Sequence, residues 1–411
     1  MSESDSPFRL AVVVSHPIQY YSPWFRHLAS QPGLQLKVFY LSDAGITKSE
    51  DVSFKTSFAW DIPLLEGYEA EFVENRSTQP GTHHFRGLNN PGASRAIRKW
   101  KPDAVLLFGY AYLTHLRLIV SPWLVGVPFL FRGDSHELFP ASGWKPLLNR
   151  WLRSLLFRRF SHFLAVGRAN VDYFRRSGVS NSKISRVPHC VDNRRFQLAA
   201  PQADLDAAEW KQSLGIPHGA AVVLFAGKLE DKKRPMDLLQ AFLNLTKSAD
   251  AVASVLLFVG SGHLESSLKD ASGAETGRRV FFAPFQNQTA MPKVYAMGDV
   301  LVLPSFGRGE TWGLAINEAM NLARPAIVSS HVGCGPDLII PEETGWKFEA
   351  GDVEALKDVL RSALSDPVRL KKMGLRAKEH IANYSYDRAT GALLQALHLK
   401  LAPSGLPAAS V

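Results

Sequence analysis

Short apolar and β-branched runs alternate along the whole chain with stretches of helical character. Such runs are typical of parallel sheets that helices cover on both faces. In the first half the runs span residues 10–14, 36–40, 104–108, 128–131 and 163–166. In the second half they span residues 221–226, 254–259, 280–282, 300–303 and 326–328. The pattern predicts an α/β fold with two doubly wound domains.

The length of 411 residues fits two domains of about 200 residues each. Residues 196–210 are rich in Ala, Gln, Asp and Pro and show no strand pattern, as expected of a linker. We therefore predict an N-terminal domain over 1–198 and a C-terminal domain over 199–384. A helix over 385–402 and a flexible tail over 403–411 complete the chain.

The charge balance favours anionic partners. The chain carries 47 Lys and Arg against 38 Asp and Glu, a formal net charge of +9, which favours phosphates, nucleic acid or lipid headgroups. The usual aromatic and basic modules for nucleic acid do not occur in the sequence, so we expect no nucleic-acid partner. Cys190 and Cys334 are too few for a disulfide framework or a four-ligand zinc site, and we expect no metal.

The hydropathy pattern predicts a cytoplasmic protein. The acidic, polar start of the chain is unlike a secretory leader. No stretch reaches the roughly 18 to 20 apolar residues that a spanning helix needs. The expected location is the cytoplasm, either free or at the inner face of the cell membrane.

Segment 304–320 carries the most informative motif. A buried strand is expected to end at Pro304, a glycine-rich loop follows, and a helix begins near Gly313. Backbone N–H groups and the positive end of a helix then meet at the strand's carboxyl edge, which predicts a phosphate site. Glu310 precedes the helix and Glu318 lies inside it, so one carboxylate can meet a sugar and the other a ribose. A solvated loop glutamate and an ordinary helix glutamate are the alternative interpretation.

A second motif, at 225–235, follows another apolar strand. After Gly227 come Lys228 and Lys233, five positions apart on a loop and a helix start. Both cations can reach one diphosphate and neutralise the charge that grows on it as a leaving group, so no metal is then needed. Alternatively, the segment is a solvated, lysine-rich face.

These two motifs resemble those of retaining glycosyltransferases of family GT4, whose GT-B fold places two Rossmann-like domains across a cleft. Glu310 and Glu318 have the spacing of that family's Glu-x7-Glu motif. The resemblance implies that Glu310 and the amides after it contact the donor sugar, whereas Glu318 binds the ribose hydroxyls. The residues after Glu310 are Thr311, Trp312, Gly313 and Leu314. The chain departs from the family at Lys228, where Arg is usual, because Lys keeps the charge but loses the bidentate fork.

Two further strand ends are donor-site candidates in the second half. Gly260 and Gly262 form a glycine loop similar to one beside the donor in the family, although a plain turn explains it nearly as well. Phe285 and Gln286 stand where the family packs the nucleobase.

The first half departs most from the family. His16 follows the first strand, where a glycine-rich loop is common, and either reaches a phosphate in the cleft or packs in the turn. Asp134 and His136 follow the strand ending at Phe131 and could orient an acceptor hydroxyl or take its proton; a surface loop is the alternative. Tyr110 is a further candidate for the acceptor wall.

Segment 144–160 is a basic amphipathic helix in which Lys and Arg alternate with Trp and Leu. It fits a helix lying on an anionic membrane surface. It also fits the outer side of an ordinary helix in a doubly wound domain. Near the end of the chain, the resemblance implies that the last helix crosses back onto the first domain.

The function implied by the resemblance is retaining, metal-independent transfer of a sugar from a nucleotide diphosphate-sugar to a hydroxyl of a glycan or lipid-linked acceptor, without a cofactor. Polysaccharide or lipopolysaccharide synthesis is the expected context. The predicted catalytic residues are Glu310, Lys228, Lys233, His16 and Asp134. Two rivals share the fold: a nucleotide-sugar 2-epimerase, which needs no acceptor, and a sugar-nucleotide or glycan-binding protein that has lost catalysis.

Overall fold

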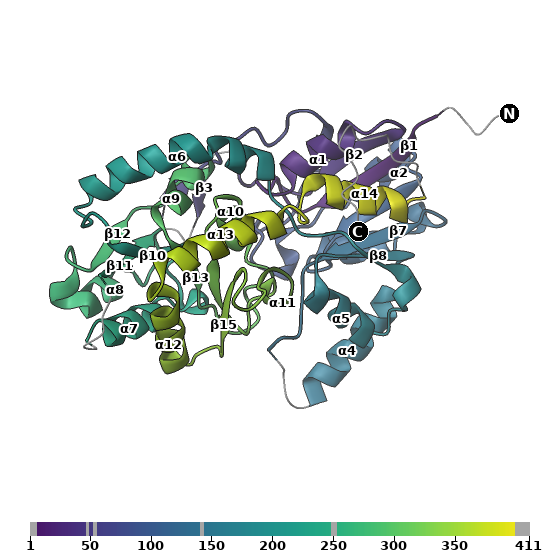
Figure 1. Ribbon diagram of the computed structural model, residues 1–411. Coiled ribbons are helices and arrows are strands. Elements are labelled where there is room, and N and C mark those ends of the chain that lie inside the picture. Colours follow the sequence, from purple (N-terminus) through teal and green to yellow (C-terminus); the bar gives the residue numbers. More distant parts are fainter. Residues whose placement is uncertain (1–5, 47–48, 52–55, 140–143, 248–252, 399–411) are drawn as a thin grey trace.

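The computed structural model describes residues 6–46, 49–51, 56–139, 144–247 and 253–398, which form two α/β domains (Figure 1). The first domain holds a seven-stranded parallel sheet in the order β5-β2-β1-β6-β7-β8-β9. Its strands are β1 Phe8–Val14, β2 Leu34–Tyr40, β5 Glu69–Phe72, β6 Ala104–Phe108, β7 Phe129–Gly133, β8 His162–Ala165 and β9 Ile184–Arg186. Between β2 and β5 the chain forms a small antiparallel pair, β3 Ser49–Asp51 and β4 Thr56–Phe58.

The second domain holds a six-stranded parallel sheet in the order β12-β11-β10-β13-β14-β15. Its strands are β10 Ala221–Ala226, β11 Ser254–Val259, β12 Val280–Ala283, β13 Val300–Leu303, β14 Ala326–Ser329 and β15 Gly345–Phe348. All ten strands predicted from apolar runs are present, so the two doubly wound sheets are confirmed. Five strands in the described part of the chain escaped prediction: the short antiparallel pair β3 and β4, and the strands β5, β9 and β15. The last three lie at sheet edges, where a continuous apolar run is not required, although the edge strand β12 does have one.

Helices cover both faces of each sheet. In the first domain they are α1 Ser22–Ala29, α2 Ala93–Trp100, α3 Leu113–Ile119, α4 Trp144–Phe157 and α5 Arg168–Arg176. In the second they are α6 Asn193–Ser213, α7 Pro235–Thr246, α8 Glu265–Ser272, α9 Met291–Met297, α10 Leu314–Asn321, α11 Gly335–Leu338, α12 Val353–Leu364 and α13 Pro367–Ile381. Apolar residues from α2, α3, α4 and α5 share one core cluster, so these helices lie on the same face of the first sheet. Within the described ranges, no helix is both long and apolar enough to cross a membrane.

The expected linker at 196–210 is wrong, because these residues belong to the continuous helix α6. The Asp192 side chain caps this helix by accepting a hydrogen bond from the Arg195 amide at 2.9 Å. Its buried face is built from Phe196, Ala203 and Ala207 against α9. Small alanines suffice at this close contact, so the segment lacks the large apolar residues that mark a helix. The predicted boundary at residue 198 therefore falls inside α6, which packs on the second domain.

The last helix, α14 Tyr386–Ala396, lies beside α1 of the first domain (Figure 1). The indole Nε1–H of Trp24 donates to Thr390 Oγ1 at 3.1 Å in a buried position. Leu393 and Leu394 complete the contact and belong to the same core cluster as Trp24. A segment that is distant in sequence from the first domain therefore helps to close its core.

The α14 contact predicts a large stability loss on truncation. Leu393→Ala should lower the free energy of unfolding by about 2–5 kcal/mol, because it leaves a cavity in a fully buried cluster. The matched control is Leu375→Ala in α13, whose side chain is 52% exposed and whose loss should change stability by less than about 0.5 kcal/mol. Chemical denaturation of the full chain measures both, and equal effects would show that α14 does not stabilise the first domain.

Candidate active site

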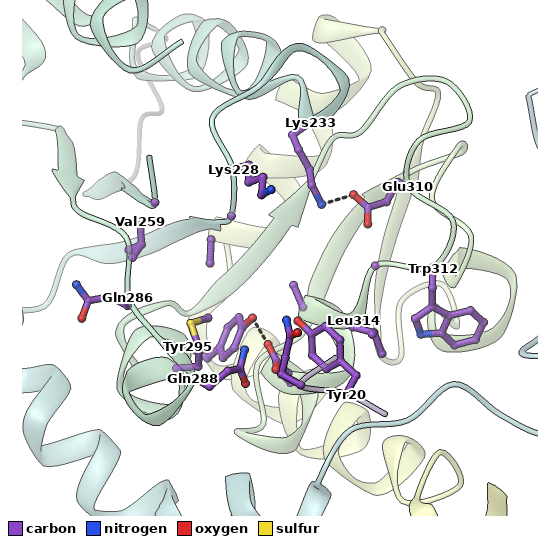
Figure 2. A pocket seen from close by; sticks show the side chains of 18 of the residues that line it. Tyr20, Lys228, Lys233, Val259, Gln286, Gln288, Tyr295, Glu310, Trp312 and Leu314 are labelled. Carbon is purple, nitrogen blue, oxygen red and sulfur yellow. Dashed lines mark hydrogen bonds and ion pairs between the residues drawn. The ribbon is translucent and has the colours of Figure 1, made fainter. Parts of the chain in front are cut away.

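A cavity of about 430 Å³ lies between the two domains (Figure 2). Its walls come from loops that follow the carboxyl ends of parallel strands in both sheets, which is where open α/β sheets bind ligands. The first domain contributes Gln19 and Tyr20 after β1, Asp134 after β7 and His189 after β9. The second contributes the loops after β10, β11, β12 and β13 and the start of α10.

Lys233 and Glu310 form an ion pair on one wall of the cavity (Figure 2). The Ser305 hydroxyl donates to the same Glu310 oxygen at 3.1 Å. Only 19% of the Lys233 side chain and 11% of the Glu310 side chain are exposed, so the pair is largely removed from water. Lys228 lines the same cavity, so both predicted cations are brought to one site.

The start of α10 points at this site. Gly313 has φ +98° and stands as the residue before the helix. A Cβ there would lie 2.9 Å from Leu303 Cδ2, so glycine is required both by the left-handed backbone and by the close approach. The turn brings Leu314 and Ala315 to the cavity wall. The first amides of α10, which have no partners within the helix, supply positive potential at that end.

Glu318 lies one and a half turns further into α10 and is 1% exposed. Its Oε2 accepts a hydrogen bond from the Tyr295 hydroxyl at 2.5 Å. Its buried Oε1 has no hydrogen-bond partner among the described residues. Burial raises the pKa of this carboxyl from 4.5 to about 7, although the Tyr295 hydrogen bond and the charge of Arg195 oppose the shift. A buried acceptor without a donor, on the wall of a cavity, is suited to a ligand hydroxyl.

Most of the other predicted donor residues line the cavity, and one does not. Those that line it are Gly227, Gly260, Phe285, Gln286, Thr311 and Trp312. Gly260 has φ +144°, and a Cβ there would lie 2.0 Å from the Gly227 carbonyl, so two strand-end loops pack backbone to backbone. Gly262 does not line the cavity, because it packs against the Leu229 backbone behind the loop.

Asp134 and His136 connect the two domains. Asp134 Oδ2 accepts a hydrogen bond from Thr311 Oγ1 at 2.6 Å. His136 Nε2 donates to the Glu310 carbonyl at 3.1 Å, and its Nδ1 accepts from the Leu138 amide at 3.2 Å. Both ring nitrogens of His136 are therefore engaged, and the side chain does not line the cavity. The prediction of His136 as an acceptor-site residue is corrected to a contact between domains, whereas Asp134 does reach the cavity.

His16 and Tyr110 lie off the cavity wall, contrary to prediction. His16 Nδ1 is 2.9 Å from the Ser15 hydroxyl, and burial lowers the pKa of the imidazole to about 4. The Tyr110 hydroxyl is 2.8 Å from the Tyr173 hydroxyl. The Tyr110 ring packs against the core cluster that α2, α3, α4 and α5 share in the first domain. The loop after β1 turns so that Gln19 and Tyr20, three and four positions beyond His16, reach the cavity.

Sequence reasoning missed several cavity residues, among them His189 and Trp60. His189 follows the unrecognised edge strand β9, and its ring stacks on Tyr21 with centroids 5.5 Å apart. Recognition of β9 would have marked the residue, because it follows a strand's carboxyl end. Trp60 comes from the segment after β4, which the Asn287 side chain holds by donating to the Ala59 carbonyl at 2.7 Å. No local sequence pattern signals that approach.

Comparison with known proteins agrees with this geometry. Residues 206–380 match the family model described as glycosyl transferases group 1, and residues 65–190 match a glycosyl transferase 4-like domain. D-inositol 3-phosphate glycosyltransferase of Rhodococcus opacus is 28% identical over 223 residues, which are 51% of this chain and 49% of the relative. The protein of the same name from Nocardia farcinica is 30% identical over 217 residues, 50% of this chain and 48% of the relative. The chain thus spans about half the length of these curated relatives.

Solved structures are similar over nearly the whole chain. Anabaena Alr3699/HepE in complex with UDP and glucose has a TM-score of 0.70 at 17% identity, covering 95% of this chain and 99% of that chain. Sucrose-phosphate synthase from Thermosynechococcus elongatus has a TM-score of 0.67 at 18% identity, covering 95% and 98%. The two family models and this shared two-domain architecture confirm the family predicted from the Glu310 and Glu318 motif. The chain belongs to the group 1, GT4-type glycosyltransferases with the GT-B fold.

Proposed function

We propose that the protein transfers a sugar, with retention of configuration and without a metal, from a nucleoside diphosphate-sugar to an acceptor hydroxyl. The observation that carries the proposal is the arrangement of charged groups on the walls of one cavity. Cations and a helix start lie on one wall, and a buried carboxylate with an unpartnered oxygen lies on another. Figure 2 shows Lys228 and Lys233 on one side of the cavity and Tyr295, hydrogen-bonded to the carboxylate, across from them.

The ribose site in this proposal is Glu318. Its free Oε1 can accept a hydrogen bond from a ribose hydroxyl, and that bond would satisfy an acceptor left unpaired in the ligand-free protein. Tyr295 holds the other oxygen and so fixes the orientation of the carboxylate. Phe285 and Gln286 line the cavity after β12 and would flank the base.

The diphosphate site in this proposal is formed by Lys228, Lys233 and the start of α10. Their positive charges stabilise the two negative charges of the ground state and the further charge that develops as the bond to the sugar breaks. That charge neutralisation is the task a divalent cation would otherwise perform. Lys233 must then divide its attraction between Glu310 and the phosphate, which frees carboxylate oxygen to accept hydroxyls of the sugar.

The proposed transfer step begins at the bond between the sugar and the diphosphate. The C1–O bond to the diphosphate breaks, and the diphosphate leaves with the bonding electrons. The acceptor oxygen forms its bond to C1 from the same face, and its proton passes to the departing phosphate oxygen. Gln19, Tyr20, Trp60 and Asp134 line the first-domain side of the cavity, where the acceptor would enter. Relatives named as D-inositol 3-phosphate glycosyltransferases and an N-acetyl-alpha-D-glucosaminyl L-malate synthase support transfer to a hydroxyl.

Removing either member of the ion pair should abolish most transfer. Lys233→Ala and Glu310→Ala are each expected to lower kcat by about 100-fold or more, because each removes charge that contacts the reacting group. Lys371→Ala, at an exposed position in α13, is the control and should keep full activity. The donor used in this assay is chosen first, as the sugar nucleotide that raises the melting temperature in a screen of UDP, GDP and ADP sugars without divalent metal.

Three outcomes of that experiment contradict the proposal. Normal transfer by both variants would show that the site is wrongly assigned. Rapid sugar isomerisation without acceptor would identify an epimerase. Tight donor binding by the wild type with no turnover in the presence of any acceptor hydroxyl would indicate a binding protein.

The buried Glu318 carboxyl predicts a pH-dependent stability difference. Its folded-state pKa of about 7 lies above the ordinary value of 4.5, so its ionisation opposes folding increasingly as pH rises from 4.5 through 7. Glu318→Gln should therefore stabilise the ligand-free protein at pH 8 by about 3 kcal/mol relative to its effect at pH 4.5. Unfolding curves at both pH values test this, with exposed Glu379→Gln as a control that should show no such change. A pH-independent effect of Glu318→Gln would contradict burial of an ionisable carboxyl.

A further inference from the structure

We infer that α4 and the neighbouring loop before β7 form a docking surface for an anionic lipid bilayer. On α4, Leu148, Trp151, Leu152 and Leu155 follow helical spacing and are 44%, 57%, 50% and 38% exposed. The opposite side of the helix packs inward through Phe157, which is 4% exposed. An exposed stripe of four large apolar residues on one helix is unusual for a surface in contact with water alone.

The apolar surface continues beyond α4. The η2 turn Pro122–Leu124 and its neighbours expose Trp123 by 53%, Val120 by 76% and Val125 by 74%. Arg159, just after α4, joins the two regions by donating to the carbonyls of Leu124 and Val127 at 3.1 and 3.3 Å. Further along, the Arg95 guanidinium of α2 lies 5.3 Å from the centre of the Trp123 ring. Figure 1 shows α4 beside α5 at the lower edge of the first domain.

The charges around this surface are predominantly positive. Segments 91–101, 113–127 and 146–160 together contain nine Lys and Arg and no Asp or Glu. Arg95, Arg117 and Arg158 are exposed. Two acidic side chains border the surface, and each is paired with arginine: Glu74 with Arg76 at 3.0 Å and Glu137 with Arg153 at 3.0 Å.

A cationic rim around exposed Trp and Leu is complementary to a bilayer with anionic headgroups. The apolar side chains enter the boundary between headgroups and acyl chains, while the arginines contact phosphates. An exposed apolar stripe alone would suit a protein partner equally well, and the excess of positive charge is what favours the lipid surface. The inference does not depend on the proposed transfer reaction.

The test is co-sedimentation of the full chain with vesicles. Vesicles of phosphatidylcholine with about 30 mol % phosphatidylglycerol should bind the protein, vesicles of phosphatidylcholine alone should bind it much less, and added salt should weaken binding. The double variant Trp151→Ser/Leu152→Ser should lower the partition coefficient by about tenfold or more, because both side chains would leave the bilayer. The matched control, Leu198→Ser/Leu205→Ser on α6, removes residues that are 71% and 63% exposed and should change it less than about twofold.

Several results would overturn the inference. One is the absence of binding of the wild type to anionic vesicles, and another is equal loss of binding in the α6 control. A wild-type dimer in light scattering that the α4 variant converts to a monomer would assign the surface to a second copy of the chain. The thermal shift with a sugar nucleotide should be the same in both double variants. That readout separates a failure of membrane docking from a failure of the proposed function.

Discussion

The ion pair between Lys233 and Glu310 is the contact around which the cleft is organised. It joins the loop after β10 to the loop after β13, and the first domain docks on the same place through His136 and Asp134. The cation proposed to bind the diphosphate is thus held, before any ligand arrives, by the carboxylate proposed to bind the sugar. The pair keeps two largely buried charged groups in place, so that little reorganisation is needed when substrate enters.

Much of the fold was predictable because most strands are buried on both faces. Ten strands show apolar runs, whereas the short pair β3 and β4 and three of the four edge strands, β5, β9 and β15, do not. The fourth edge strand, β12, is apolar and was predicted. Helix α6 was mistaken for a linker for two reasons. Its contact with α9 uses the small residues Ala203 and Ala207, and it contains Pro201, whereas proline is usually disfavoured inside a helix. Burial pattern predicts an element well only where large side chains make the contact.

The second-domain wall of the cavity was largely predictable and the first-domain wall was not, for a related reason. Glu310, Gly313 and Glu318 lie on one loop and one helix, so their relative positions depend on local geometry. The positions of His16, Tyr20 and Trp60 depend instead on how loops of the first domain turn and how closely they approach the second. Such tertiary placement leaves no periodic trace in a single sequence. The exposed stripe on α4 was predictable in part. Its amphipathic pattern is visible in the sequence, but only the structure shows that its apolar side chains are exposed.

The central claim is that one cavity binds a nucleoside diphosphate through its cations and a ribose through Glu318. Calorimetric titration with UDP, GDP and ADP and with their 2′- and 3′-deoxy forms, without divalent metal, tests it most directly. The account predicts that at least one ribonucleoside diphosphate binds, that one of its deoxy forms binds about tenfold more weakly or worse, and that Glu318→Gln removes this difference. Equal binding of all three forms by the wild type, or a difference that persists in Glu318→Gln, would contradict the assignment of Glu318 to the ribose.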